Sequence, residues 1–332
     1  MSRPNIILGG ASFGLDERSM FNTPEKAQAA LDVYRSYGHR IIDTARLYPS
    51  DKPGTSEEIL GQTDLSGFTI DTKAWSQPGK HTPAELQKSI NESLAALRLP
   101  KVHMLYLHWP DTETPLTEVM KGIDAIHKQG KFDQFGISNF TLEQIKQMLS
   151  ICEEHNYIKP KVYQGQYNIL ARHVEAELIP LLHENDIAFY AWSPAAGGVL
   201  NKKASTRLNS EDALGNVSRS WYGKPRTLEA IDKVIEVAEK HGLTGHSVTL
   251  NWVLHHSALN GEAGDGMVFG ARTIEQLRNT CDAIDAGPLP DEVVKLLDQI
   301  WEEAKEYAPP YNPFAKEDAA LSNFLKDRQE GK

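Results

Sequence analysis

Hydrophobic and polar positions along this chain fall into blocks that predict strands, each followed by a helix. Eight short apolar runs end near Gly10, Ala45, Ala74, His108, Ser138, Gln166, Trp192 and Gly270. Most of these ends lie about thirty residues apart, the length of one strand and the helix that leads to the next parallel strand. The runs are almost wholly apolar, as in strands that are covered on both faces. The pattern predicts an α/β fold with a parallel sheet.

Helix starts between these strands are marked by threonine, followed either by proline or by Glu or Gln three residues later. The signals stand at Thr23, Thr82, Thr114, Thr141 and Thr273. Thr-Pro is typical of a first helical turn, and Thr-x-x-Glu/Gln is the capping-box pattern. Regular alternation of eight strands with helices predicts a (β/α)8 TIM barrel. An open doubly wound sheet is the competing geometry.

The length of 332 residues suits one barrel with additions, and no shift in composition marks a second folded domain. We therefore expect a single barrel domain over residues 1–332. Two stretches interrupt the alternation of strands and helices. Residues 194–226 form a long loop after the seventh strand, which long-loop statistics associate with lids or disorder. A C-terminal helix and tail follow the barrel, and the extension at about 315–332 is mostly polar.

Composition and charge narrow the classes of function. Hydrophobic residues make up 40% and charged residues 24% of the chain, and the formal net charge is -10. Without a run of Lys and Arg, a nucleic-acid partner is disfavoured. No stretch approaches the roughly 18 apolar residues of a membrane span, and the N-terminus does not have the pattern of a signal peptide. We expect a cytoplasmic protein with no membrane partner.

Metal binding is not expected from the cysteines or histidines. The two cysteines, Cys152 and Cys281, match no zinc or redox spacing. Four histidines lie in helical patterns without carboxylates at ligand spacing, namely His241, His246, His255 and His256. The sequence therefore predicts no metal site.

Candidate chemistry lies where three successive strands end. Asp43 and Tyr48 follow the second strand, Lys73 ends the third and His108 ends the fourth. The carboxyl ends of parallel barrel strands meet at one rim, where barrel enzymes place their active sites. Each residue alone is commonly a cap, turn or packing group. Their occurrence on consecutive strand ends favours a shared site.

These four residues together suit the polarisation and protonation of a carbonyl group. A phenol titrates near pH 10, and a unit charge about 4 Å away changes that by roughly 3 units only in a sheltered site. Tyr48 therefore needs both burial and the Lys73 ammonium, and Asp43 is the natural counter-ion of that ammonium. His108 could orient the carbonyl oxygen. A separate hydride donor is required, which indicates a nicotinamide cofactor.

This set resembles the aldo-keto reductases, over about residues 5–314. The segment Asp43-Thr44-Ala45-Arg46-Leu47-Tyr48 is similar to the signature around the catalytic aspartate and tyrosine of that family. Thr72-Lys73 and Leu107-His108 match its lysine and histidine segments. Shared patterns such as Tyr167-Asn168 bring the chain nearest to the aflatoxin-aldehyde reductase branch. The resemblance implies Tyr48 as proton donor, tuned by Lys73 and Asp43, with His108 positioning the carbonyl.

The resemblance also implies where a cofactor lies. Ser138, Asn139 and Gln164 would hold the carboxamide, and Trp192 would stack on the nicotinamide. Phosphate sites of such barrels lie after strands seven and eight, and the candidates there are Ser193, Gly197, Gly198, Leu200, Gly270, Arg272, Thr273 and Gln276. Arg272 offers a fork suited to a phosphomonoester at a helix start, which favours NADPH over NADH.

Two positions depart from the family pattern. Thr280 stands where many relatives have an asparagine for the adenine, and Gly270 stands where a lysine is often found. Gly9–Gly14 follows the first strand without the G-x-G-x-x-G spacing of a dinucleotide loop, and a turn explains it. Four aromatic residues are candidate walls for the substrate: Trp75, Trp109, Trp221 and Tyr222.

The sequence thus predicts an NADPH-dependent oxidoreductase that reduces aldehydes, and some ketones, to alcohols. The expected partner is a small carbonyl compound, with a homodimer as in related proteins of the branch. One alternative is a barrel lyase in which Lys73 forms a Schiff base. Another is a cofactor-binding, redox-sensing subunit with little turnover.

Overall fold

The computed structural model describes residues 2–15, 19–201 and 221–311. Eight parallel strands close into one barrel in chain order, with β8 paired to β1. The strands are β1 (Asn5–Gly9), β2 (Ile41–Asp43), β3 (Thr69–Ala74), β4 (Val102–Leu107), β5 (Phe132–Ser138), β6 (Val162–Gln166), β7 (Ala188–Trp192) and β8 (Gly266–Phe269). Closure in a single ring confirms the (β/α)8 prediction and excludes the open doubly wound sheet.

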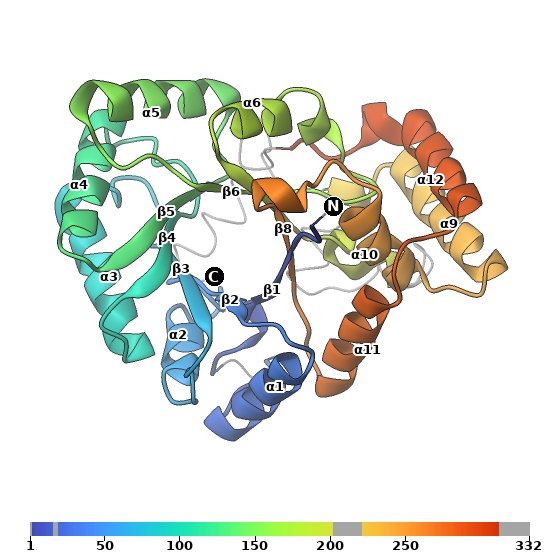
Figure 1. Cartoon of the computed structure of the whole chain (residues 1–332), viewed down its shortest axis with the longest axis horizontal. Coiled ribbons are helices and arrows are strands. Elements are labelled where there is room, and N and C mark those ends of the chain that lie inside the picture. Colours follow the sequence, from blue (N-terminus) through green and yellow to red (C-terminus); the bar gives the residue numbers. More distant parts are fainter. Residues whose placement is uncertain (1, 16–18, 202–220, 312–332) are drawn as a thin grey trace.

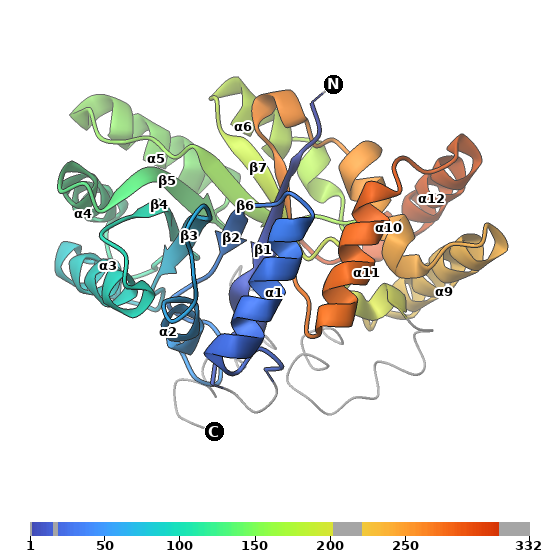
Figure 2. The ribbon, with the colours of Figure 1, turned by 60° about the horizontal axis from the view of Figure 1, so that its bottom comes forward.

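Helices form a ring outside the strands, as the view along the barrel shows (Figure 1). They are α1 (Pro24–Ser36), α2 (Thr55–Leu60), α3 (Pro83–Leu97), α4 (Leu116–Lys128), α5 (Leu142–His155), α6 (Leu178–Glu184), α9 (Pro225–Lys240), α10 (Gly245–His255), α11 (Ile274–Asp285) and α12 (Asp291–Ala304). The turned view separates α9 and α12, which lie side by side beyond α10 and α11 (Figure 2). Short 3-10 turns are η1 (Gly10–Ser12), η2 (His173–Glu175), η3 (Ala196–Asn201), η4 (Gly261–Ala263) and η5 (Lys305–Tyr307).

Alternation of side chains along each strand separates two apolar regions. Odd and even positions point to opposite faces, so one set fills the barrel and the other packs beneath the helices. The inner set is a small cluster of Ile7, Met104, Tyr106, Val162, Ala188, Tyr190 and Val268. The outer set belongs to a much larger core between the strands and the helices. The barrel is therefore a packed core whose chemistry is confined to its rim.

Four of the five predicted threonine signals cap helices as expected. The hydroxyls of Thr23, Thr82, Thr141 and Thr273 each accept a hydrogen bond from the backbone N–H three residues later. Thr114 differs, because its hydroxyl donates to Asp111 and the helix begins at Leu116. Each cap that forms satisfies one of the N–H groups left without a partner at a helix start.

Two of the three predicted capping boxes are only half formed. Thr141 and Gln144 make both reciprocal bonds. Glu85 instead pairs with Lys80, 3.1 Å away, and the Gln276 side chain accepts from the backbone N–H of Arg272 at 3.0 Å. The sequence pattern specifies the threonine bond, whereas a long Glu or Gln side chain goes to whichever donor lies nearer.

The long loop after β7 is described in part. It contains η3, whose Gly197 and Gly198 both have positive φ, and the segment Trp221–Tyr222 that leads to α9. Residues 202–220 and the predicted extension at 315–332 lie outside the described residues. In the described part of the chain, no helix is both long and apolar enough to cross a bilayer.

Candidate active site

An ion pair buried at the end of β2 and β3 forms the centre of the predicted site. The Lys73 ammonium donates to Asp43 Oδ2 and to the backbone carbonyl of Thr44, the latter at 3.0 Å. The side chain of Lys73 is fully buried and that of Asp43 is 3% exposed. Gln164 of β6 donates to the other Asp43 oxygen at 3.1 Å. Burial with full pairing keeps this ammonium charged where an unpaired one would be very costly.

Tyr48 and His108 lie beside this ion pair. The Lys73 Nζ atom is 5.1 Å from the centroid of the Tyr48 ring. The rings of Tyr48 and His108 meet edge to face, with centroids 5.4 Å apart and planes at 85°. The structure therefore brings together all four predicted residues, Asp43, Tyr48, Lys73 and His108, called the tetrad below.

Burial and neighbouring charge shift the pKa of three tetrad groups. Burial raises the pKa of the Tyr48 phenol; the Lys73 ammonium opposes this and Asp43 adds to it. Burial disfavours the Lys73 ammonium, but Asp43 and Tyr48 outweigh it, so the pKa of Lys73 is raised. Burial, with Lys73 and His81, lowers the pKa of His108 well below its ordinary value. At neutral pH the site holds a protonated phenol, an ammonium and a neutral imidazole.

The pKa of the Tyr48 phenol shifts in the opposite direction to that expected from the sequence. The charge of Lys73 was expected to bring the phenol pKa down, yet burial has the larger effect. The ammonium thus limits an increase in the pKa. The phenol remains a proton donor at neutral pH, because it is fully protonated there.

A loop network behind His108 was not predicted from the sequence. The His108 backbone N–H donates to Ser76 Oγ at 3.2 Å, and the Nε2 atom of the buried His81 lies 2.8 Å from the same oxygen. The Asp111 carboxylate accepts from the backbone N–H groups of Gly79 and His81. No periodic pattern marks loop residues of this kind, so only their closeness in the fold identifies them.

The predicted carboxamide residues offer groups that fit a nicotinamide. Asn139 follows β5 in the left-handed conformation, with φ of 63°. Its Nδ2 atom donates to the His108 carbonyl at 3.0 Å and to Ser138 Oγ at 2.9 Å. Its buried Oδ1 atom accepts no hydrogen bond from the described residues. A buried acceptor without a partner costs free energy, and an amide N–H₂ group would satisfy this one.

The residues predicted after β7 form a tightly folded loop. Trp192 is half-buried and packs against the inner cluster. Ser193 has φ of 56°, and its hydroxyl accepts from the Gly197 N–H at 2.8 Å, while the Gly198 N–H donates to the Ala195 carbonyl. Leu200 is buried against the start of α10, where a Cβ on Gly245 would lie 2.1 Å from the Leu200 oxygen. The close approach of helix and loop therefore requires glycine at that position.

The residues predicted after β8 lie at the start of α11. Gly270 and Arg272 are exposed, and the Arg272 guanidinium makes no ion pair among the described residues. Thr273 and Gln276 hold the first turn through the bonds described above. Thr280, one turn further, is buried, and its hydroxyl contacts His246 Nε2 at 2.9 Å. The Thr280 hydroxyl therefore already has a hydrogen-bonding partner on α10.

The four predicted substrate aromatics lie in different surroundings. The Trp109 ring packs against His108 with centroids 4.5 Å apart and planes tilted by 38°, and the Trp221 ring lies 5.8 Å from that of Trp192. Trp75 is half-buried just past β3. Tyr222 is fully buried, and its hydroxyl accepts from Gln166 and Asn168 of the β6 region. Tyr222 therefore anchors its segment, and three aromatic side chains remain as candidate walls.

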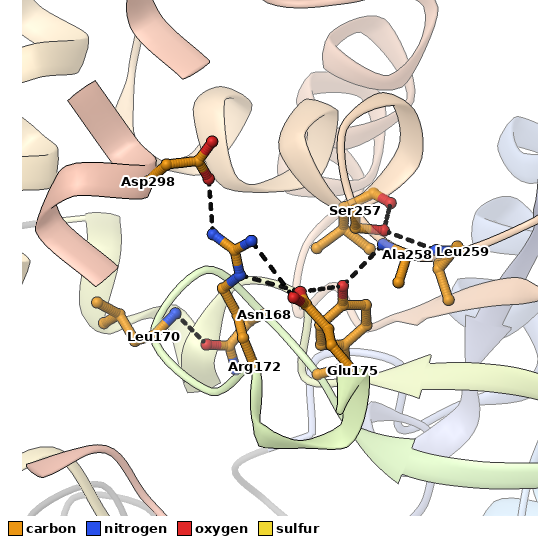
Figure 3. A network of polar contacts seen from close by, with 10 residues as sticks. Asn168, Leu170, Arg172, Glu175, Ser257, Ala258, Leu259 and Asp298 are labelled. Atoms are coloured by element: carbon orange, nitrogen blue, oxygen red, sulfur yellow. Dashed lines mark hydrogen bonds and ion pairs between the residues drawn. The ribbon is translucent and has the colours of Figure 1, made fainter. Parts of the chain in front are cut away.

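A polar network at the end of β6 supports this side of the barrel (Figure 3). Arg172 donates to Glu175 at 2.9 Å and to Asp298 of α12 at 2.7 Å. Its guanidinium also lies over the Trp252 ring, 4.5 Å from the centroid. Asn168, in the same loop, donates to the Ser193 carbonyl at 3.1 Å. Through these bonds α12 and α10 hold the loop that positions the β7 end.

A model of the Aldo/keto reductase family matches residues 5–302. The chain belongs to this family. It is 37% identical over 322 residues to "Oxidoreductase sirO" of Leptosphaeria maculans, covering 93% of this chain and 97% of that protein. It is 34% identical over 335 residues to "Aflatoxin B1 aldehyde reductase member 2" of Homo sapiens, covering 94% and 91%.

A solved structure of an aldo/keto reductase has the same fold. The glycerol dehydrogenase AKR11B4 from Gluconobacter oxydans superposes with a TM-score of 0.70 at 23% identity, over 89% of this chain and 90% of that one. Membership of the aldo/keto reductase family makes this protein an oxidoreductase, in a family that generally uses nicotinamide cofactors. Among the described residues, no group of three or more His, Cys, Asp or Glu side chains is placed to hold a metal ion.

Proposed function

We propose that this aldo/keto reductase reduces aldehydes, and some ketones, to alcohols with NADPH, and that Tyr48 donates the proton. The observation that carries the proposal is the convergence of the tetrad around the buried Lys73–Asp43 ion pair. The names of relatives that act on aflatoxin B1 aldehyde support an aldehyde substrate.

The chain's own residues account for binding and proton transfer. Neutral His108 carries one N–H, which would donate to the carbonyl oxygen and orient it. Tyr48 would pass its proton to that oxygen, and the neighbouring ammonium stabilises the phenolate that forms. Lys73 then returns a proton to the phenolate. Asp43 holds the Lys73 ammonium in place, and Gln164 in turn holds the Asp43 carboxylate.

Cofactor binding would use residues already on the rim of the barrel. Ser138 and the unpartnered Asn139 Oδ1 would take the carboxamide, and Trp192 would stack on the ring. When bound, reduced nicotinamide supplies the hydride that the protein side chains cannot. Arg272, exposed at the start of α11, would take the 2′-phosphate, which is why NADPH is proposed over NADH.

The Schiff-base alternative fits the site less well. A lysine nucleophile needs a lowered pKa so that its amine is free. Lys73 has a raised pKa and is fully paired with Asp43. Borohydride trapping of a carbonyl substrate on Lys73 would support the lyase nonetheless.

The test is a panel of aldehydes, ketones and sugars with NADPH and with NADH, followed at the nicotinamide absorbance band. For Tyr48→Phe we expect kcat to fall by about 10²–10⁴, because the proton donor is lost. NADPH binding, measured by fluorescence quenching, should stay within a few-fold. Turnover by Tyr48→Phe equal to that of the parent would refute the role of Tyr48. Absence of turnover in the parent with every carbonyl tried would favour a redox-sensing subunit.

A further inference from the structure

A second buried carboxylate lies beneath the tetrad. Asp71 is on β3, two residues before Lys73, and its Cα pairs in register with that of Asp43 on β2. Side chains two apart on a strand share a face, so Asp71 points into the barrel as Lys73 does. It is 1% exposed. The proposed reaction assigns this residue no role.

Asp71 is bonded on one oxygen only. His103 of β4 lies with its Nδ1 atom 2.8 Å from Asp71 Oδ1. The other oxygen, Oδ2, is buried and accepts nothing from the described residues. The hydroxyl of Tyr106, which belongs to the inner cluster of the barrel, is also buried, and among the described residues only Gln164 is near enough to affect it as a hydrogen-bonding neighbour. His103 is the second residue of β4 and its side chain is 32% exposed, so the pair reaches the base of the barrel.

Charged and titratable groups face Asp71 from several elements. The charged groups are Asp43 on β2, Lys73 on β3 and His103 on β4. The Asp71 charge also raises the pKa of three phenols on α1, β4 and β7, namely Tyr34, Tyr106 and Tyr190. His103 itself faces Lys101 and Asp133 at the base. Among the described residues, Asp43, Lys73 and His103 are the charged groups with the largest effect on Asp71.

Stability alone is a weak reason to bury such a pair. Replacing a buried ion pair by apolar residues of similar volume is often neutral or stabilising. Burial raises the pKa of Asp71 to about 6, with His103 opposing and Asp43 adding to the shift. The hydrogen bond with Asp71 raises the pKa of His103. Asp71 therefore carries its full negative charge only above about pH 6, and its carboxylate is among the groups that raise the pKa of Lys73.

We propose that Asp71, held by His103, is a positioning residue whose negative charge keeps Lys73 an ammonium as the pH rises. This inference rests on the proposed reduction. In that step the Tyr48 O–H bond breaks as its proton joins the carbonyl oxygen, and the cofactor's hydride supplies the electron pair to carbon. A Lys73 N–H proton then restores the phenol. Asp71 exchanges no proton in the step and acts only through its charge.

The experiment measures kcat and kcat/KM against pH in the parent and in Asp71→Asn, which keeps the shape and removes the charge. We expect the basic limb of kcat/KM to move down by about half a pH unit or more, the effect of removing one unit charge from a residue two positions away on a strand, a spacing of about 7 Å. At neutral pH, KM for the cofactor should stay within twofold. The basic limb moves down because Lys73, without the neighbouring carboxylate, loses its proton at a lower pH.

Three further variants make the result specific. Asp71→Glu should restore the basic limb, because it restores the charge. Asp71→Ser is a second uncharged variant that should shift the limb as Asp71→Asn does, and it serves if the asparagine variant does not fold. Asp133→Asn removes an exposed carboxylate near His103, 48% exposed and paired with Lys101. It should leave the limb unchanged.

Titration of the His103 ring by NMR adds a readout that does not depend on turnover. We expect its midpoint to fall in Asp71→Asn, because its carboxylate partner is gone. Basic limbs that coincide in the parent and both uncharged variants would overturn the inference while leaving the proposed reduction intact. A parent that reduces no carbonyl would overturn the proposed function, and the inference with it.

Discussion

Buried uncharged histidines beside the tetrad make the molecule sensitive to acid at the scale of single residues. Burial lowers the pKa of His81 from 6.5 to about 4, with Asp111 partly opposing it. The folded protein therefore binds a proton at His81 less tightly than the unfolded chain does. The stability that His81 contributes is present above pH 6.5 and is lost as the pH falls toward 4.

For the parent we expect the free energy of unfolding to fall by about 2–3 kcal/mol between pH 7 and pH 4.5 from His81 alone. Urea denaturation at the two pH values measures the difference. His81→Gln keeps a polar group near Ser76 without a titratable ring, so its loss over this range should be smaller by that amount. An equal loss in the variant and the parent would contradict the assignment.

Much of the candidate site could be predicted from single residues, and the remainder shows what such reasoning lacks. Asp43, Lys73 and His108 end buried strands, and strand ends are visible in an apolar run. Asp71 has the period-two spacing from Lys73 that places both inside the barrel, and this spacing is visible in the sequence. Asp111 has no such signal, because its partners are backbone N–H groups of a loop whose course no pattern specifies.

Elements are held to one another by Arg172, and this gives a prediction for stability. Arg172 is 14% exposed and joins η2 to α12 through Glu175 and Asp298. Arg172→Met should lower the free energy of unfolding by about 2–3 kcal/mol, because Glu175, only 27% exposed, loses its charged partner and among the described residues keeps only the Tyr167 hydroxyl.

A matched control is available on α9. Arg226 makes an i,i+3 pair with Glu229 in which both side chains are more than half exposed. Arg226→Met should change stability by less than about 0.5 kcal/mol, as is usual for exposed pairs. Thermal or urea unfolding of the two variants measures the contrast. Equal effects would mean that Arg172 contributes only as a surface charge.

The start of α11 carries the prediction on cofactor preference. Arg272→Gln should weaken NADPH binding by about 10-fold or more and leave NADH binding unchanged, because a charge-assisted bond to phosphate is lost. Arg278 lies within α11, beside Tyr37, the residue that follows α1. Arg278→Gln is therefore the control, and fluorescence titration with both cofactors is the measurement. A parallel loss for NADH would exclude a role in phosphate discrimination.

At the level of elements, the sequence predicts strands and helix starts better than it predicts side-chain partners. All eight strand ends fall close to those predicted, because apolar runs and turn residues are local signals. Glu85 and Gln276 lie three residues after capping threonines, yet neither completes a box. Their partners, Lys80 and the Arg272 N–H, come from the loop before each helix. The hydrophobic periodicity of the sequence does not predict the conformation of such loops.

The whole molecule depends on a barrel interior that is tightly packed where β4 and β5 meet. Gly136 of β5 faces that interior, and a Cβ there would lie 2.4 Å from ring atoms of Tyr106. Overpacking of this kind typically costs about 1–3 kcal/mol. Gly136→Ala should therefore lower the urea midpoint of the whole transition.

Gly270 provides the comparison, because a Cβ there meets nothing within 4 Å and its φ is not in the left-handed region. Gly270→Ala should leave the urea midpoint unchanged or slightly raised, since alanine restricts the unfolded chain more than glycine does. A Gly136→Ala midpoint equal to that of the parent would mean that the inner cluster relaxes around the added methyl group.

The pairing of β1 with β8 sets an order of events when the protein is made. Of the eight barrel strands, Asn5–Gly9 leaves the ribosome first, yet the strand it must join, Gly266–Phe269, leaves last. Until that strand emerges, both edges of the growing sheet have unpaired backbone groups, which are prone to pair with other chains. Nascent chains that stop before residue 266 are therefore the ones we expect to need chaperones.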